Sequence, residues 1–204
     1  MKKIILASNN AHKIQEIREI LKEFPFEIKS LKDENINIDV EEDGTTFEEN
    51  AKKKACEIAN FLKSRGEEEF IVMADDSGLE VDYLDKMPGI YSARYAGEHG
   101  NDKKNNEKLL KELKDVPKEK RGAQFVCQIV LVDQNEKCLS IKGEVRGRIL
   151  EELSGKEGFG YDPLFFYEPL NKTFGELSSE EKNSVSHRAC ALRELKKKIK
   201  EFLN

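Results

Sequence analysis

The chain has 204 residues, of which 37% are charged and 38% are hydrophobic, and its formal net charge is −5. This length predicts a single domain with a substantial buried core, and the negative balance argues against a general nucleic-acid-binding surface. No segment reaches the length of a membrane span, and the apolar run at residues 4–7 is too short for a signal peptide. We therefore expect neither nucleic acid nor a membrane as a partner.

The cysteines are widely spaced and form no CxxC pair; they are Cys56, Cys127, Cys138 and Cys190. Such spacing favours reduced thiols and a cytoplasmic protein. Cys127 and Cys138 fall in strand-like segments, which leaves a cross-strand pair as the alternative.

The first predicted elements alternate between strand and helix. Residues 3–7 predict a strand, and Ser8-Asn9-Asn10 predicts a tight loop that caps a helix. Apolar residues then recur at helical spacing, at Ile14, Ile17, Leu21 and Phe24. Pro25 ends this helix, and residues 26–30 predict a second strand.

Thr46-Phe47-Glu48-Glu49 has the form of a capping box. The helix that it opens carries an apolar stripe at Phe47, Ala51, Ala55, Ile58 and Leu62. Gly66 ends the helix, and the apolar run at residues 70–74 predicts a buried strand. We expect Asp75-Asp76-Ser77-Gly78 to form a loop after that strand, with a further strand at residues 79–82.

The second half of the chain adds a helix at residues 102–114 and an antiparallel hairpin formed by residues 124–132 and 138–149. Pro88-Gly89 predicts a turn between the halves. A final helix carries an apolar stripe at Val185, Ala189, Leu192, Ile199 and Leu203. Strand–helix units followed by a hairpin predict an α/β fold with a mixed sheet.

Polar clusters fall at the ends of these elements, and the first runs from Ser8 to Lys13. Backbone N–H groups at a helix N-terminus attract anions, and Lys13 adds a full positive charge. This loop is therefore a candidate phosphate site, although serine and asparagine are also ordinary helix caps. We interpret His12 as a polar loop residue.

The second cluster is acidic. Successive side chains of a strand point to opposite faces, so only one of Asp75 and Asp76 faces a given site. Glu42 together with Asp76 provides the carboxylate pair with which proteins hold Mg²⁺. Lys54 follows Glu49 by about one and a half helical turns and is placed to reach phosphate. A turn, a solvated acidic loop and a surface lysine are the alternatives.

The third cluster is Gly158-Phe159-Gly160-Tyr161-Asp162-Pro163. Glycines let a backbone approach a ligand, and an aromatic ring beside them can stack on a base. The alternative is a structural loop around a buried aromatic residue.

The fourth cluster is Lys182 with Ser186-His187-Arg188. The apolar stripe of the final helix places His187 off the core face. Arginine and histidine can donate to O6 of a keto purine, where adenine presents a donor instead, so the cluster would select keto purines over ATP. A basic, solvated helix start is the alternative.

The order and spacing of these motifs resemble those of a known family. The matching segments are Ser8-Asn9-Asn10-x-x-Lys13, Phe47-x-Glu49-Asn50-Ala51-x-x-Lys54-Ala55, Ala74-Asp75-Asp76-Ser77-Gly78-Leu79, Pro88-Gly89-Ile90-Tyr91-Ser92-Ala93-Arg94-Tyr95, Gly158-Phe159-Gly160-Tyr161-Asp162-Pro163 and Glu181-Lys182-x-x-x-Ser186-His187-Arg188. From Lys3 to the last helix, the chain resembles the inosine triphosphate pyrophosphatases, also called XTP/dITP diphosphatases or non-standard purine NTP pyrophosphatases. Asn9 departs from the glycine of many members, which leaves the backbone of that loop open.

The resemblance implies Mg²⁺-dependent hydrolysis of ITP, dITP and XTP to the monophosphate and pyrophosphate, which cleanses the nucleotide pool. It also implies a homodimer. The implied fold is one domain over residues 1–204, two-lobed, with a long central mixed sheet flanked by helices and the active-site cleft between the lobes.

The resemblance also implies roles for individual residues. Asp76 matches the proton acceptor, and Glu42 with Asp76 matches the metal site. Phe159 matches the ring that stacks on the base. The residues that match substrate contacts are Ser8, Asn9, Asn10, Ala11, His12, Lys13, Lys54, Ser77, Phe159, Gly160, Tyr161, Asp162, Lys182, His187 and Arg188.

Two other functions remain open. One is a regulatory module that binds purine nucleotides without cleaving them, against which the presence of both Glu42 and Asp76 argues. The other is a pyrophosphatase for modified pyrimidine nucleotides, against which the Phe159 loop and the His187-Arg188 pair argue.

Overall fold

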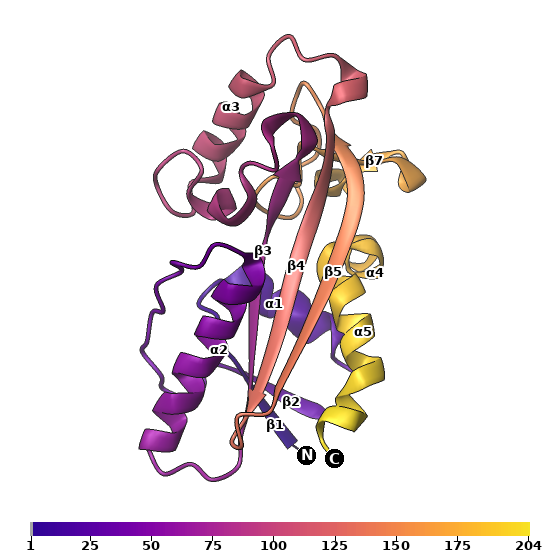
Figure 1. Cartoon of the computed structure of the whole chain (residues 1–204). Coiled ribbons are helices and arrows are strands. Elements are labelled where there is room, and N and C mark those ends of the chain that lie inside the picture. The colour runs from indigo at the N-terminus through magenta and orange to yellow at the C-terminus, as the bar shows by residue number, and fades with distance from the viewer. Residues whose placement is uncertain (1) are drawn as a thin grey trace. The chain divides into compact units, whose positions relative to one another are not determined.

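The computed structural model describes residues 2–204 and shows helices and strands that alternate along the first half of the chain (Figure 1). The strands are β1 (Lys2–Leu6), β2 (Phe26–Ser30), β3 (Ile71–Val81), β4 (Gly122–Asp133), β5 (Cys138–Ile149), β6 (Phe165–Tyr167) and β7 (Lys172–Thr173). The helices are α1 (Ala11–Ile20), α2 (Phe47–Ser64), α3 (Asp102–Glu112), α4 (Ser179–Val185) and α5 (His187–Phe202). Among the described residues, no helix combines the length and the apolar character needed to cross a membrane.

The strands form one 7-stranded sheet in the order β2-β1-β3-β4-β5-β6-β7. β1 runs parallel to β2 and to β3, whereas β6 is antiparallel to β5 and to β7. Residues 134–137 join the neighbouring strands β4 and β5, and so short a connection permits only an antiparallel pair. The predicted mixed sheet and hairpin are therefore confirmed.

Contacts along the chain divide it into two compact units, each with its own core. The first unit comprises Met1–Asp76, Cys127–Gly143 and Arg188–Asn204, and the second comprises Ser77–Val126 and Glu144–His187. β3, β4 and β5 each contribute residues to both units. The chain passes from the first unit to the second directly after Asp76.

The first unit buries side chains on both faces of its strands. In β1, Ile4 and Leu6 face the cluster that contains α1 and α5, while Ile5 faces the cluster that contains α2. This alternation follows from the two-residue period of a strand. The stripe predicted for α2 is confirmed, because its members are all buried: Phe47, Ala51, Ala55, Ile58 and Leu62.

The core of the second unit is rich in aromatic side chains. The Phe125 ring lies 4.6 Å from that of Phe165 and 5.8 Å from that of Phe174, measured between ring centroids. Helix α3 adds Leu109 to this cluster. Contacts of this kind pack closely and fix the strands that carry them.

The predicted loop at Asp75-Asp76-Ser77-Gly78 is wrong, because β3 continues without interruption from Ile71 to Val81. The strand continues because Leu79 and Val81 extend the buried apolar pattern into the core of the second unit. Both aspartates therefore lie inside a strand rather than in a turn, and the strand holds their backbone extended.

Two helix predictions also need correction. The final helix is broken at Ser186, which is extended with ψ 161°, so α4 and α5 are separate helices. At the start of α2, the Thr46 hydroxyl accepts from the Glu49 N–H as predicted. The Glu49 carboxylate, however, accepts from the N–H and hydroxyl of Thr45.

Candidate active site

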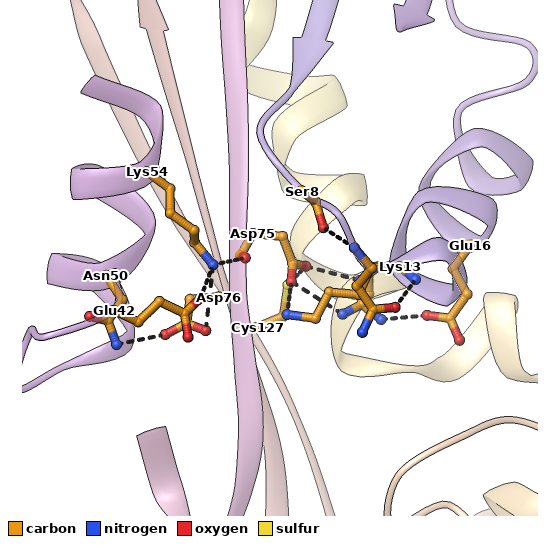
Figure 2. Close-up of polar contacts among 11 residues, drawn as sticks. Ser8, Lys13, Glu16, Glu42, Asn50, Lys54, Asp75, Asp76 and Cys127 are labelled. Carbon is orange, nitrogen blue, oxygen red and sulfur yellow. Dashed lines mark hydrogen bonds and ion pairs between the residues drawn. The ribbon is translucent and has the colours of Figure 1, made fainter. Parts of the chain in front are cut away.

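Asp75 and Asp76 are neighbours on β3, and their side chains lie on opposite sides of the strand (Figure 2). Asp75 is directed toward Lys13 and Cys127, and Asp76 toward Glu42. Both aspartates are buried, with exposed fractions of 1% and 5%. The prediction that only one of them faces a given site is confirmed.

Asp75 is the centre of a buried ion-pair network in the first unit. Its Oδ1 lies 2.7 Å from Lys13 Nζ, and its Oδ2 accepts from Arg188 Nε at 2.9 Å. The Cys127 thiol donates to the same Oδ2 at 3.0 Å. Arg188 also pairs with Glu16 of α1.

The charges of this network decide the protonation of Asp75. Burial alone would raise its pKa, but Arg188 and Lys13 outweigh that effect and hold the pKa well below its usual value. Burial, reinforced by the Asp75 charge, raises the pKa of the Cys127 thiol well above normal. Asp75 is therefore an ionised carboxylate surrounded by donors, and one of those donors is Lys13.

Asp76 faces a second cluster, in which Asn50 makes the central contacts. Asn50 Nδ2 donates to Asp76 Oδ2 at 3.1 Å, and Asn50 Oδ1 accepts from the Gly44 N–H at 2.8 Å. A Cβ at Gly44 would lie 2.7 Å from that amide oxygen, so this contact excludes a side chain at residue 44. Asn50 thus ties the acidic segment before α2 to Asp76.

The sequence interpretation missed Asn50 as a site residue. A signal for it was present, because Asn50 lies three residues after Phe47 and one before Ala51, on the buried stripe of α2. A polar side chain in an apolar stripe needs buried hydrogen-bond partners. Asn50 is fully buried and has two of them.

Lys54 places one positive charge between two carboxylates. Its Nζ lies 2.5 Å from Glu42 Oε1 and 3.8 Å from Asp76 Oδ1, and it also donates to the Asp75 carbonyl oxygen at 2.7 Å. Both carboxylates therefore reach a single cation position (Figure 2). Burial raises the pKa of Asp76, Lys54 and Lys13 oppose that rise, and Glu42 adds to it.

The chemistry of this carboxylate pair suits a hard divalent cation. No group of three or more histidine, cysteine, aspartate or glutamate side chains is arranged for a metal within the part of the chain that the structure describes. Mg²⁺ does not need such a group, because it takes one or two protein carboxylates and completes its shell with water and phosphate oxygens. Glu42 and Asp76 fit that requirement.

Residues 8–10 form the loop that caps α1, as predicted, but the interpretation of His12 as a loop residue is wrong, because Ala11, His12 and Lys13 form the first turn of α1. Asn10 caps the helix by accepting from the Lys13 N–H at 3.1 Å, and the Ser8 hydroxyl accepts from the Asn10 N–H at 3.2 Å. Residues 9–12 are exposed, whereas Ser8 and Lys13 are half-buried. The exposed loop and the partly covered Lys13 are compatible with an anion site.

The second unit holds the loop that contains Phe159. Asp162 Oδ2 accepts from the Phe159 N–H at 2.8 Å and from Lys182 Nζ at 2.6 Å. Lys182 Nζ also lies 4.7 Å from the centroid of the Phe159 ring. A Cβ at Gly158, whose φ is +74°, would stand 2.0 Å from the same Asp162 oxygen, so the loop requires glycine there.

His187 and Tyr161 are core residues of the second unit. The His187 ring stacks on Phe125 with centroids 4.8 Å apart, and the residue is only 5% exposed. The prediction that His187 lies off the core face is wrong, because its ring packs on Phe125 in the second unit, whereas the apolar stripe of α5 packs in the first. Tyr161 is buried, and its hydroxyl donates to the Ser92 carbonyl at 2.8 Å.

The Arg188 guanidinium is buried in the structure, and its predicted contact with the substrate stays a prediction. Its side chain is 0% exposed and is bound by Asp75 and Glu16. This burial has no signal in the local sequence, because both partners are distant in the chain.

The structure therefore gathers the predicted residues into two groups, each within its own unit. Members of the first unit are Ser8, Asn9, Asn10, Ala11, His12, Lys13, Glu42, Lys54, Asp76 and Arg188. Members of the second unit are Ser77, Phe159, Gly160, Tyr161, Asp162, Lys182 and His187.

Comparisons with known proteins agree with this picture. A family model described as the Ham1 family matches residues 4–198. The dITP/XTP pyrophosphatase of Clostridium perfringens is 64% identical over 204 residues, which is 100% of both chains. That of Bacillus subtilis is 45% identical over 197 residues, or 97% of this chain and 96% of the relative.

Solved structures share the fold. The Ham1 protein of Staphylococcus aureus superposes with a TM-score of 0.85 at 42% identity, covering 98% of this chain and 99% of that one. A HAM1 protein from Coxiella burnetii gives a TM-score of 0.84 at 37% identity, with coverage of 98% and 100%.

Proposed function

The chain belongs to the Ham1 family, and we propose that it hydrolyses the non-standard purine nucleotides ITP, dITP and XTP to the monophosphate and pyrophosphate. The observation that carries the proposal is the pair Glu42 and Asp76, which share one cation position that Lys54 reaches, while Lys13 lies with Asp75 on the other side of β3. Similar proteins that are named dITP/XTP pyrophosphatase support the same reaction on dITP and XTP.

We assign the metal to Glu42 and Asp76 and propose that it is Mg²⁺. The Lys54 ammonium already stands as a cation against both carboxylates, which supports the fit. When bound, Mg²⁺ would neutralise phosphate charge and polarise the bond to the leaving pyrophosphate. Lys13 and Lys54 would bind phosphate oxygens and stabilise the charge that develops on them.

Asp76 is the proton acceptor in this proposal. The attacking water forms a bond to the α-phosphorus, the bond from that phosphorus to the bridging oxygen breaks, and pyrophosphate leaves. The proton of the water passes to an Asp76 carboxylate oxygen. Burial raises the pKa of Asp76, which makes it a stronger base than an exposed aspartate, and the Asn50 amide orients it.

The residues of the second unit would bind the base. A purine stacked on Phe159 would lie near Lys182, whose ammonium is 4.7 Å from the centroid of the same ring. Lysine is a donor only, so it favours the O6 acceptor of hypoxanthine and xanthine over the amino group of adenine. His187 and Arg188 stay in the proposal as substrate contacts, and in the structure Arg188 is held by Asp75 and Glu16.

A panel of nucleoside triphosphates, assayed with and without Mg²⁺, tests the proposal. We expect ITP, dITP and XTP to yield monophosphate and pyrophosphate, ATP to react far more slowly, and chelation to stop the reaction. Release of orthophosphate alone, or equal rates on ITP and ATP, would contradict it. A single-turnover experiment in which ITP binds but stays intact would favour the regulatory module instead.

The family resemblance further supports a homodimer that works in the cytoplasm. Sedimentation equilibrium of the purified protein tests the dimer directly, because a mass of about twice 23.4 kDa is expected. A monomer at the concentrations used for the assay would remove the dimer from the proposal without affecting the reaction.

A further inference from the structure

Helix α3 holds both polar groups of the Gly160 peptide segment. The Gly160 N–H donates to Asp102 Oδ2 at 2.7 Å, and the Gly160 carbonyl accepts from Asn106 Nδ2 at 2.8 Å. Asp102 and Asn106 are four residues apart in a helix, so their side chains lie on the same face. All three residues belong to the second unit, and the two contacts form one clamp.

The Asn106 side-chain amide acts only as a hydrogen-bond donor in these contacts. Its Nδ2 also donates to the Asp102 carbonyl at 2.9 Å, whereas its buried Oδ1 has no hydrogen-bond partner among the described residues. Rotating the amide by half a turn would place that oxygen against two carbonyl oxygens. A buried acceptor without a partner is unfavourable, so the gain from Asn106 lies in its two donated bonds.

The clamp completes the support of Phe159. On its N-terminal side, the Phe159 N–H is fixed by Asp162, which Lys182 holds in turn. On its C-terminal side, Gly160 adopts φ +62°, a backbone conformation that few residues other than glycine accept, and α3 holds it there. The backbone is therefore fixed on both sides of the ring that would receive the base.

We propose that Asp102 and Asn106 are positioning residues that hold Phe159 in its base-stacking orientation and so determine the affinity for the purine. This inference rests on the proposed function, in which Phe159 stacks on the base. A ring that is already oriented loses little conformational entropy when the base binds, and the smaller entropy loss makes binding tighter. Neither residue needs to touch the nucleotide.

Asn106→Ala tests the inference, because a positioning role predicts that the substitution changes KM much more than kcat. We expect KM for ITP to rise about tenfold while kcat changes by no more than about twofold, since the loop and not the phosphate site is loosened. Binding of pyrophosphate, which carries no base, should be unchanged in a calorimetric titration. KM for ITP within error of the wild type, or an equal loss of pyrophosphate affinity, would overturn the inference.

Asn105→Ala is the matched control. Asn105 is also a buried asparagine of α3, but its amide bonds to the backbone of Ala93 and Ala96 rather than to Gly160. We expect Asn105→Ala to lower thermal stability without raising KM for ITP. An equal KM rise in Asn105→Ala would show that any damage to α3 has the same effect, and would refute the positioning role.

A variant at Asp102 provides a second test that does not depend on the folding of Asn106→Ala. Asp102 is exposed, so Asp102→Ala should fold, and it should raise KM for ITP while Asp102→Asn, which keeps an acceptor oxygen, restores it. If the wild type fails to cleave ITP, the proposed function fails, and dissociation constants for ITP replace KM. Wild-type protein that binds no ITP, or variants that bind it equally well, would then overturn the inference.

Discussion

The Nζ of Lys54 lies 2.5 Å from Glu42 Oε1, at a place that a divalent cation would have to share or take over. The same ammonium lies 3.8 Å from Asp76 Oδ1, so it offsets the repulsion between the two carboxylates. Lys54 therefore keeps the pair together before any metal arrives. With Mg²⁺ held by these carboxylates as proposed, the ammonium would have to move away, and substrate phosphates would provide a new partner for it.

Replacing Lys54 by methionine separates these two roles. Lys54→Met keeps the length of the side chain but removes the competing charge, so we expect tighter Mg²⁺ binding in the absence of nucleotide and a higher KM for ITP. Calorimetric titration with Mg²⁺ measures the first effect and steady-state kinetics the second. Weaker Mg²⁺ binding by the variant would show that Lys54 does not compete for the carboxylates.

Asp76→Asn should lower kcat for ITP by about 10²–10⁴-fold, the usual contribution of a positioned general base. The substitution should not lower the stability of the folded protein. Because burial raises the folded-state pKa of Asp76, the ionised carboxylate destabilises the fold at neutral pH, and a neutral amide removes that effect. A thermal midpoint at or above that of the wild type, together with inactivity, is the expected result.

Asp75→Asn should behave in the opposite way. It removes the carboxylate that neutralises Lys13 and the fully buried Arg188, and breaking such a buried pair costs about 3–5 kcal/mol of unfolding free energy. Denaturant titration measures the loss. Asp76→Asn serves as the control one residue away, and equal stability of the two variants would contradict the division of roles between them.

Stability at acidic pH can be followed through Asp82 in the second unit. Arg146 and Lys86 pair with Asp82 and lower its pKa to about 2, so its ionised form is favoured in the folded state. A carboxyl with a lowered pKa stabilises the fold above its unfolded pKa, and the contribution is lost as the pH falls from about 4 to about 2.

Asp82→Asn should therefore reduce stability at pH 7 and make little difference near its folded-state pKa. The side chain is 37% exposed, and solvent screening keeps the expected loss below about 1 kcal/mol. Urea titrations of both proteins across this pH range measure the difference. A difference that grows toward acid would have the wrong sign for a lowered pKa.

Helices and strands that follow from the local spacing of apolar residues could be predicted from the sequence. The apolar stripe of α2 and the β4–β5 hairpin follow from residues close to one another in the chain, and both are confirmed. The opposite directions of Asp75 and Asp76 follow from strand geometry alone. The loop expected around them was wrong because long-range pairing in the sheet decides whether polar residues stay in a strand.

Features that depend on distant partners could not be predicted in this way. Arg188 meets Asp75 across 113 positions of sequence, and Asn106 meets Gly160 across 54. No window of local sequence contains both members of either pair. His187 was placed wrongly because it packs on Phe125, 62 positions away in the sequence, and the apolar stripe of the final helix carries no sign of that contact.

The closeness of Gly158 to Asp162 has a genetic consequence. One added methyl group at residue 158 would meet the oxygen that binds Lys182 and the Phe159 N–H. Every missense change in a glycine codon adds at least that much. Codon 158 should thus be among those of the gene that tolerate the fewest missense changes, even though residue 158 is exposed and has no side chain.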